Sequence, residues 1–174
     1  MIPVEPEILI ASEIVAAMHQ VAIGAAENAA FAFHDAAALG TRLNLLVNTD
    51  SEQEALAAAQ RARTEIDRLN SILNWRDPAS ELSQLNQSRR HVASPDLLAV
   101  IAAAERWRET TGGAYSGRLG RVLELWRKAQ SSPPDAAEVE RLAAAARTAN
   151  IEIDLAARTI VRPEAVHFDL DGLA

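Results

Sequence analysis

Three polar segments of the sequence carry the side chains that could do chemistry. They are residues 77–86 (DPASELSQLN), residues 111–116 (TGGAYS) and residues 168–174 (FDLDGLA). Each lies at the end of a stretch with regular apolar patterning, and such element ends are where binding and catalytic groups concentrate. The sequence therefore predicts a site that is formed from these segments.

The middle segment is suited to a flat ligand. Gly112 and Gly113 would let a ring approach the backbone closely, and the ring of Tyr115 could stack on it. The same residues also fit a helix C-cap followed by a buried tyrosine, and the segment by itself favours this second interpretation. Taken alone, this segment leaves both interpretations open.

The last segment places a carboxylate between two apolar side chains. We expect Phe168 and Leu170 to turn toward the core, so Asp169 needs donors or a cation nearby. Asp169 therefore either faces a ligand or caps the next turn by accepting from the N–H of Asp171 or Gly172. In an extended segment Asp169 and Asp171 share one face, which suits a cation or the polar edge of a ligand, although a solvated strand end is equally ordinary.

Several common functional signals are absent from the sequence. It contains no G-x-G-x-x-G, no Gly-Lys-Ser/Thr phosphate loop and no G-x-S-x-G around Ser116. The four histidines have no i, i+4 spacing, and there is no cysteine, so neither a zinc helix nor a thiolate metal site is expected. The net charge of -7 argues against a nucleic-acid partner, because phosphates require clustered Lys and Arg.

Helices must position most of these groups. Ser51 with Glu54 predicts a capping box, and Ser94 followed by Pro95 is typical of a helix start. Pro133 and Pro134 break the chain ahead of a further capped helix. Apolar periodicity and these signals predict helices over residues 51–73, 80–86, 94–110, 119–130 and 135–148.

The strands are predicted as short antiparallel pairs. Residues 30–33 and 42–47 form one pair, residues 151–154 and 159–162 form a hairpin, and residues 166–170 form a final strand. This order predicts an α+β fold, with helices packed on an antiparallel or mixed sheet. We expect residues 1–29 to be an N-terminal arm, with a weak helix over 12–20, and residues 30–174 to belong to one domain.

The N-terminus and the hydropathy argue against membrane insertion. Residues 1–20 contain three Glu and no Lys or Arg, the reverse of an export signal. No apolar run reaches the roughly 18 residues that a membrane-spanning helix needs. We therefore expect no membrane-spanning segment in this chain.

Taken together, the polar segments resemble the ApbE family of FAD-using flavin transferases. That family has a Gly-Thr pair after a strand, then Glu-Ile-x-Arg-Leu, Ser-Glu-Leu-Ser-x-Leu-Asn, Thr-Gly-Gly-Ala-Phe-Asp, Leu-Trp and Asp-Leu-Gly-Gly-Ile-Ala-Lys-Gly. The matching blocks are residues 39–41, 65–69, 80–86, 111–116, 125–126 and 169–174. Each block is weak alone, but their joint order and spacing, from about residue 30 onward, make the resemblance specific.

The resemblance implies a function. Members of the family bind FAD and, with magnesium, transfer its FMN part to a Ser or Thr hydroxyl of a flavin-acceptor protein, releasing AMP. Some relatives instead hydrolyse FAD to FMN and AMP. Family members usually act outside the cytoplasm, which implies a periplasmic location. The alternative is a non-catalytic module that binds flavin or serves in assembly.

The resemblance also implies which residues form the site. FAD-binding positions match Leu39, either Trp75 or Arg76, the loop residues Ala114, Tyr115 and Ser116, and Asp169, while the backbone carbonyl of Gly172 matches a metal ligand. Ser116 departs from the family's Asp, so the resemblance does not imply the polar FAD contact of that carboxylate here. The family's Lys-Gly pair, catalytic His and Asp/Thr metal ligands would lie beyond Ala174. We therefore expect this chain alone to lack the C-terminal catalytic part and to perform no flavin transfer.

Overall fold

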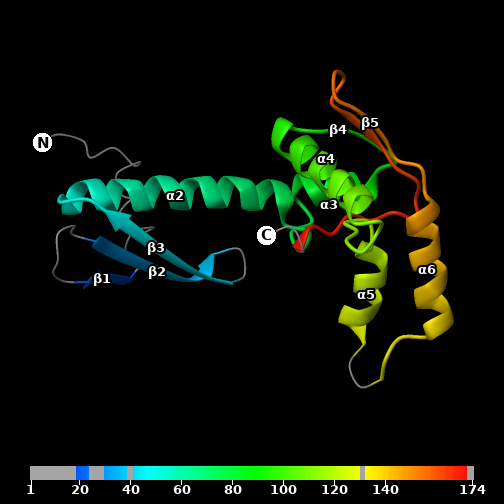
Figure 1. Ribbon diagram of the computed structural model, residues 1–174, viewed down its shortest axis with the longest axis horizontal. Coiled ribbons are helices and arrows are strands. Elements are labelled where there is room, and N and C mark those ends of the chain that lie inside the picture. The colour runs from blue at the N-terminus through cyan, green and yellow to red at the C-terminus, as the bar shows by residue number, and fades with distance from the viewer. Residues whose placement is uncertain (1–18, 24–29, 39–40, 130–131, 172–174) are drawn as a thin grey trace, which may run out of the picture. The chain divides into compact units, whose positions relative to one another are not determined.

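The computed structural model describes residues 19–23, 30–38, 41–129 and 132–171. Within these residues the chain forms five helices and six strands, which confirms the predicted α+β class (Figure 1). The chain divides into two compact units, Met1–Asn70 and Ser71–Ala174. Each unit is described below by itself.

The first unit contains a three-stranded antiparallel sheet in the order β1-β2-β3, formed by His19–Ile23, Ala30–Ala38 and Thr41–Asn48. The predicted pair of strands is present and is longer than expected. His19 and Gln20, assigned to the end of a weak helix, instead belong to β1, because pairing with β2 satisfies their backbone groups. Residues 12–18 of that expected helix lie outside the described residues.

Helix α2 (Glu52–Leu73) follows the sheet and buries Ala55 and Ala59 near Phe33. Its start differs in detail from the predicted capping box. Ser51 Oγ does accept from the N–H of Glu54 at 3.4 Å, but the Glu54 carboxylate accepts from Thr49 Oγ1 at 2.7 Å. The N–H of Ser51 donates to the same Thr49 oxygen at 3.3 Å, so Thr49 takes the second half of the box.

The second unit contains four helices: α3 (Glu81–Gln87), α4 (Pro95–Thr110), α5 (Gly120–Lys128) and α6 (Ala136–Thr148). Ser80, Ser94 and Asp135 cap three of them, each accepting a backbone N–H with its side chain. After α4, Gly112 and Gly113 adopt φ of 60° and 86°, a region that favours glycine. The N–H of Gly113 then closes the helix on the carbonyl of Arg108 at 2.8 Å, so the predicted C-cap is present.

A small antiparallel sheet in the second unit has the order β4-β6-β5. The predicted hairpin corresponds to β5 (Glu152–Asp154) and β6 (Thr159–Val161), and β4 (Arg90–Val92) was not predicted. Residues 166–170 do not form the expected strand. They run beside the loop before α5, where the chain makes a single bridge between His167 and Leu119, because no strand is available as a partner.

The core of the second unit is apolar and continuous. Phe168 and Leu170 are both buried in it, as predicted. Ile72 and Leu73, at the end of α2, pack against it. Its buried members are Leu82, Leu85, Ala93, Leu97, Leu98, Ile101, Ala104, Ile160, Val166, Phe168 and Leu170.

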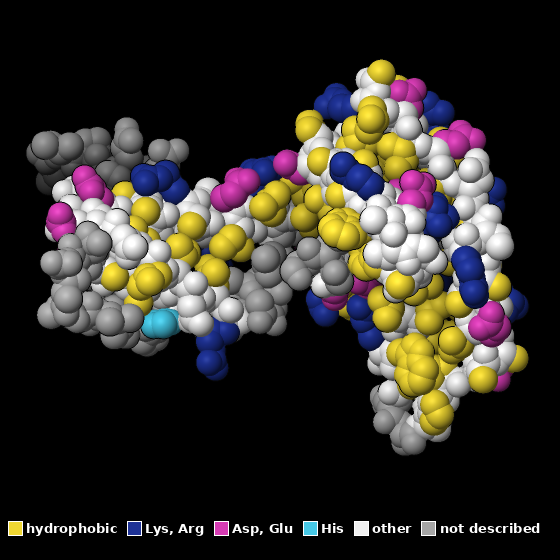
Figure 2. Space-filling model, viewed as in Figure 1, with side chains coloured by type: hydrophobic (Ala, Val, Ile, Leu, Met, Phe, Trp, Pro, Cys, Tyr) yellow, Lys and Arg dark blue, Asp and Glu magenta, His cyan; other side chains and the backbone are white. Residues whose placement is uncertain are grey.

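Some large apolar side chains remain on the surface of the second unit. Trp107 on α4 and Leu123 and Trp126 on α5 are exposed, and hydrophobic side chains are visible over this region (Figure 2). Among the described residues, no helix has both the length and the apolar content needed to cross a membrane.

Candidate functional site

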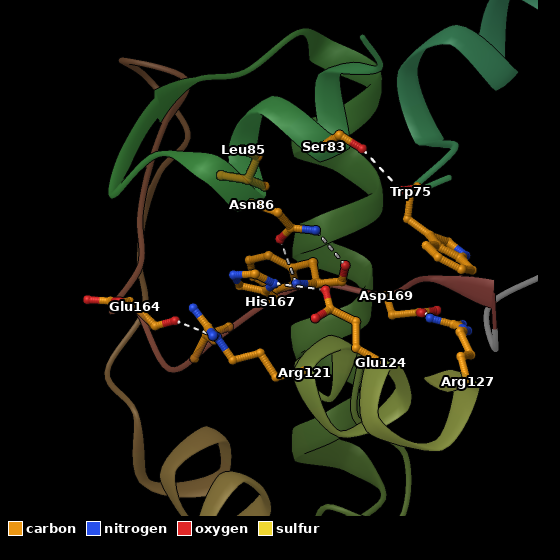
Figure 3. A network of polar contacts seen from close by, with 12 residues as sticks. Trp75, Ser83, Leu85, Asn86, Arg121, Glu124, Arg127, Glu164, His167 and Asp169 are labelled. Carbon is orange, nitrogen blue, oxygen red and sulfur yellow. Dashed lines mark hydrogen bonds and ion pairs between the residues drawn. The ribbon is translucent and has the colours of Figure 1, made fainter. Parts of the chain in front are cut away.

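A cleft of about 230 Å³ opens beside Trp75 in the second unit. The turn after α2, helix α3, one face of α5 and the extended segment around Phe168 all contribute to its walls (Figure 3). Pockets that bury a whole drug-sized ligand usually measure about 300–1,000 Å³. The cleft is therefore of a size to hold one part of a larger ligand. Its lining residues are Trp75, Arg76, Pro78, Ser83, Asn86, Gln87, Gly120, Glu124, Arg127, His167, Phe168 and Asp169.

Two arginines and two carboxylates surround the ring of Trp75. The guanidinium carbons of Arg127 and Arg76 lie over this ring, 3.6 and 4.3 Å from its centroid. The indole Nε1 donates to Asp171 Oδ2 at 2.9 Å, and Nη2 of Arg76 is 3.4 Å from the same oxygen. Nη2 of Arg127 bonds Asp169 Oδ2 at 2.7 Å and lies 3.5 Å from Asp171 Oδ2. The cluster thus combines an aromatic ring with two cations and two anions.

Asp169 is buried, with 6% of the residue exposed, and both of its oxygens have partners. Oδ2 accepts from Arg127, while Oδ1 accepts from the N–H of Asp171 at 3.2 Å. The second bond is the turn-capping contact that the sequence left open as an alternative. Asp169 therefore caps the turn and also faces the cleft, so the two interpretations are compatible.

Asn86 fixes the backbone next to Asp169. Its amide Nδ2 donates to the carbonyl of Phe168, and its Oδ1 accepts from the N–H of Phe168, both at 2.8 Å. Ser83, one turn earlier on α3, donates its hydroxyl to the carbonyl of Trp75 at 3.2 Å. Helix α3 therefore holds both the Trp75 turn and the Asp169 segment through side-chain to backbone bonds.

His167 lies on the far side of the cleft from Trp75 and contacts Glu124 (Figure 3). Its Nδ1 is 3.5 Å from Glu124 Oε1. Burial, reinforced by the charges of Arg121 and Arg162, lowers the pKa of His167 below its ordinary value, and Glu124 opposes this only in part. His167 is therefore neutral at neutral pH, and the arginines are the permanent cations among the lining residues.

Gly120 is required by the packing of α5 against this segment. Its N–H donates to the carbonyl of His167 at 2.9 Å, and a Cβ at this position would lie 2.8 Å from the same oxygen. Any side chain larger than hydrogen would push α5 away. Close approach at Gly120 is what brings Glu124 and Arg127, one and two turns later on the same face, into the cleft.

The loop of residues 111–117 borders the segment around Asp169 and does not line the cleft. The carbonyl of Gly117 accepts from the N–H of Asp169 at 2.8 Å. Ala114 is exposed, and Ser116 lines a separate hollow with Gly112 and Gly113. Tyr115 packs against the core, and its hydroxyl has no hydrogen-bond partner within the described part of the chain. Burial raises the pKa of Tyr115, and the negative charges of Asp169 and Glu105 raise it further.

The comparisons with known proteins concern the family and the fold of the chain. Residues 39–174 match the ApbE family. The chain belongs to the ApbE family. Among solved structures, the apo form of Pseudomonas stutzeri flavinyl transferase ApbE aligns with a TM-score of 0.58 at 15% sequence identity, covering 90% of this chain and 50% of that chain. At such low identity the likeness shows the fold alone, and this chain spans about half the length of that ApbE. A search of curated proteins found no match.

The structure brings together some of the positions that the ApbE resemblance implied. Trp75, Arg76 and Asp169 all line the cleft. Which of Trp75 and Arg76 matches the family's FAD-binding position stays open. Ala114, Tyr115 and Ser116 lie next to the Asp169 segment through Gly117, and their contact with FAD stays a prediction. Leu39 and Gly172 lie outside the described residues.

Sequence reasoning missed Arg127 as a member of the site. The signal that could have found it is the spacing of Gly120, Glu124 and Arg127 at i, i+4 and i+7, which places them on one face of α5. Among the residues that the structure describes, no group of three His, Cys, Asp or Glu side chains could hold a metal ion.

Proposed function

We propose that the chain binds FAD at the Trp75 cleft and acts, as part of a flavin transferase, in moving FMN from FAD to a Ser or Thr of an acceptor protein. The observation that carries this proposal is the convergence of Trp75, Arg76, Arg127 and Asp169 on one cleft. An aromatic face suits a ring of FAD, guanidinium groups suit its pyrophosphate, and a buried carboxylate suits a polar ring edge. Membership of the ApbE family supports the same ligand.

The proposed reaction replaces the phosphoanhydride bond between the two halves of FAD with a phosphoester bond to the acceptor. The acceptor hydroxyl oxygen forms a bond to the phosphorus of the FMN half, the pyrophosphate P–O bond breaks, AMP leaves and the hydroxyl proton passes to solvent. In this scheme the residues of the cleft bind and orient FAD, since positioning and charge stabilisation supply most of the catalysis in phosphoryl transfer. Hydrolysis of FAD to FMN and AMP follows if water takes the place of the acceptor hydroxyl.

Magnesium is part of the proposal through the family resemblance. The ion would neutralise charge on the pyrophosphate. The described residues do not form a metal site by themselves, because Asp169 and Asp171 are both engaged with Arg127. The proposed ligand, the carbonyl of Gly172, lies outside the described residues. We also propose a periplasmic location, which fractionation of cells expressing the tagged chain would test.

FAD binding is the first test of this proposal. Titration of FAD into the protein, followed by flavin fluorescence, should give saturable binding, and Trp75→Ala should weaken it by roughly tenfold or more through loss of the stacking face. Trp126→Ala is the matched control, because Trp126 is an exposed tryptophan that does not line the cleft. Equal loss in both variants, or no binding by the unmodified chain, would reject the site.

Turnover separates the candidate activities. The protein is incubated with FAD, with magnesium or a chelator, and the products are separated by chromatography. Release of AMP with flavin attached to protein indicates transfer, and AMP with free FMN indicates hydrolysis. Saturable binding without AMP release is the result expected for this chain alone, and it is also the result expected for a non-catalytic flavin-binding module.

A further inference from the structure

Arg127 contacts the Trp75 ring and the Asp169 carboxylate, the two groups that should bind the ligand in the proposed function. Its guanidinium carbon lies 3.6 Å from the centroid of the Trp75 ring, and its Nη2 bonds Asp169 at 2.7 Å. A guanidinium is flat and cationic, so it stacks on indole as a ring would and pairs with a carboxylate at the same time. One side chain from α5 therefore contacts both the Trp75 ring, over which Arg76 also lies at 4.3 Å, and the buried anion (Figure 3).

A ligand ring that stacks on this face of Trp75 must take the place of the guanidinium. Two flat groups cannot lie at stacking distance from one ring face together. The Arg127 side chain is 32% exposed, so its contacts are partly screened by water. A cation–π contact at an exposed site opposes displacement by only about two- to fivefold in affinity. The cation–π contact therefore permits displacement, but displacement leaves the cation without its partners and the Asp169 carboxylate, whose side chain is 3% exposed, without its cation.

The displaced guanidinium has donors available for a new partner. Of its nitrogens only Nη2 is engaged, whereas Nε and Nη1 donate to no acceptor among the residues that the structure describes. Arginine presents five N–H donors in a planar fork that matches phosphate oxygens. A phosphate attached to the incoming ring would therefore replace the carboxylate that the guanidinium loses.

We propose that Arg127 is a specificity-determining residue that makes the cleft prefer a flat ring carrying a phosphate over the same ring without one. This inference rests on the proposed function. An unphosphorylated ring displaces Arg127 and offers it nothing in return, whereas a phosphorylated ring gives it a charge-assisted hydrogen bond. Removing Arg127 thus has opposite effects on the two kinds of ligand.

The test measures dissociation constants for riboflavin against FMN and for adenosine against AMP, because either ring of FAD could lie on Trp75. Quenching of Trp75 fluorescence reports binding in a Trp107→Phe, Trp126→Phe background, in which both replaced residues are exposed. For the pair of probes that competes with FAD, Arg127→Gln should lower the dissociation constant of the unphosphorylated ligand by about two- to fivefold. It should weaken the phosphorylated ligand by about tenfold, the effect of losing a charge-assisted hydrogen bond.

Two further variants separate this role from general charge and from folding. Lys128→Gln removes the same charge from the next position, where Lys128 is exposed and lies 4.0 Å from Glu124, and it should leave the preference unchanged. Arg127→Lys keeps the charge but loses the planar fork, and it should retain part of the preference.

The outcomes distinguish this inference from the proposed function. If the unmodified protein binds neither FAD nor any of the four probes, the proposed function is wrong, and the inference fails with it. If the unmodified protein binds FAD but Arg127→Gln weakens both members of a pair equally, the inference alone is overturned. The same holds if Lys128→Gln reproduces the effect of Arg127→Gln.

Discussion

Replacing Asn86 by Ala should destabilise the second unit more than the exposure of this residue indicates. Asn86 is only half-buried, but its amide makes two bonds of 2.8 Å to the backbone of Phe168. Phe168 itself is 1% exposed. Alanine removes both bonds and leaves a buried N–H and a buried carbonyl without partners.

The magnitude follows from the two groups that lose their partners. An unsatisfied buried polar group costs about 1–3 kcal/mol, so two groups cost roughly 2–6 kcal/mol. Water can enter from the cleft beside Asn86, which favours the lower half of this range, about 3 kcal/mol. A domain of the size of the second unit loses roughly 4–8 °C in melting temperature per kcal/mol. Asn86→Ala should therefore lower the melting temperature by more than about 10 °C.

Differential scanning calorimetry provides the measurement, because the two units can give separate transitions. Gln87→Ala is the matched control, since Gln87 is the exposed neighbour on α3 and should change stability by less than about 0.5 kcal/mol. Asn86→Ala should also weaken FAD binding, because Phe168 directly precedes Asp169. A shift in Asn86→Ala no larger than that of Gln87→Ala would refute the reasoning.

Three further predictions concern the same region. Gly120→Ala places a Cβ 2.8 Å from the His167 carbonyl, so it should lower the free energy of unfolding by about 1–3 kcal/mol in thermal unfolding. An unchanged free energy of unfolding would contradict the close packing. Because the pKa of His167 is lowered in the fold, its contribution to stability is complete above pH 6.5, its ordinary pKa, and is lost as the pH falls toward the folded-state value. Between pH 7.5 and pH 5.5 the melting temperature of His167→Gln should therefore fall by less than that of the unmodified protein. Equal falls in melting temperature would assign the pH dependence to other groups. Asp169→Asn keeps the bond to the Asp171 N–H and should cost at most about 1 kcal/mol in stability while weakening FAD binding by about 1–3 kcal/mol; unchanged affinity by titration would remove Asp169 from the site.

The helices could be predicted because their signals are local. Serine and aspartate caps, Pro95 after Ser94 and the glycine pair after α4 each act within a few residues, so the helix limits agree closely with the structure. Strand β4 has only three residues and becomes a strand solely by pairing with β6. The segment around Phe168 has an apolar strand pattern, but its neighbour is a loop. The missed strand β4 and the wrongly predicted strand at residues 166–170 both depend on which segment lies alongside, and a single sequence does not contain that information.

The residues of the site also divide into some that the sequence predicts and some that it does not. Asp169 and either Trp75 or Arg76 were predicted through the resemblance to the ApbE family, and the structure places all three on one cleft. Arg127 was missed because its spacing from Gly120 and Glu124 indicates a shared helix face but not that this face meets a cleft. Its position follows from the contact of Gly120 with the His167 backbone, which fixes the rotation of α5.

Arg162 explains how these distant motifs hold their positions. It is 4% exposed and donates to the carbonyls of Leu85 at 2.8 Å and Val166 at 2.5 Å, and also to the carbonyl of Asn86. Burial lowers the pKa of the Arg162 guanidinium, and the charge of Arg121 adds to this effect, while Glu164 opposes it. The carbonyls at the end of α3 carry the negative end of the helix dipole, so a buried cation is stabilised there without a carboxylate.

The guanidinium of Arg162 and the amide of Asn86 both hold the backbone of residues 166–168 by hydrogen bonds. Arg162 ties the last carbonyls of α3 to residue 166, and Asn86 then binds the backbone of residue 168. Asp169 follows directly, so these bonds fix the backbone from which its carboxylate reaches Arg127 and the N–H of Asp171. Trp75, Arg127 and Asp169 can therefore be replaced with little loss of the cleft's shape. Replacing Asn86 or Arg162 instead removes the bonds that hold the backbone beside the cleft.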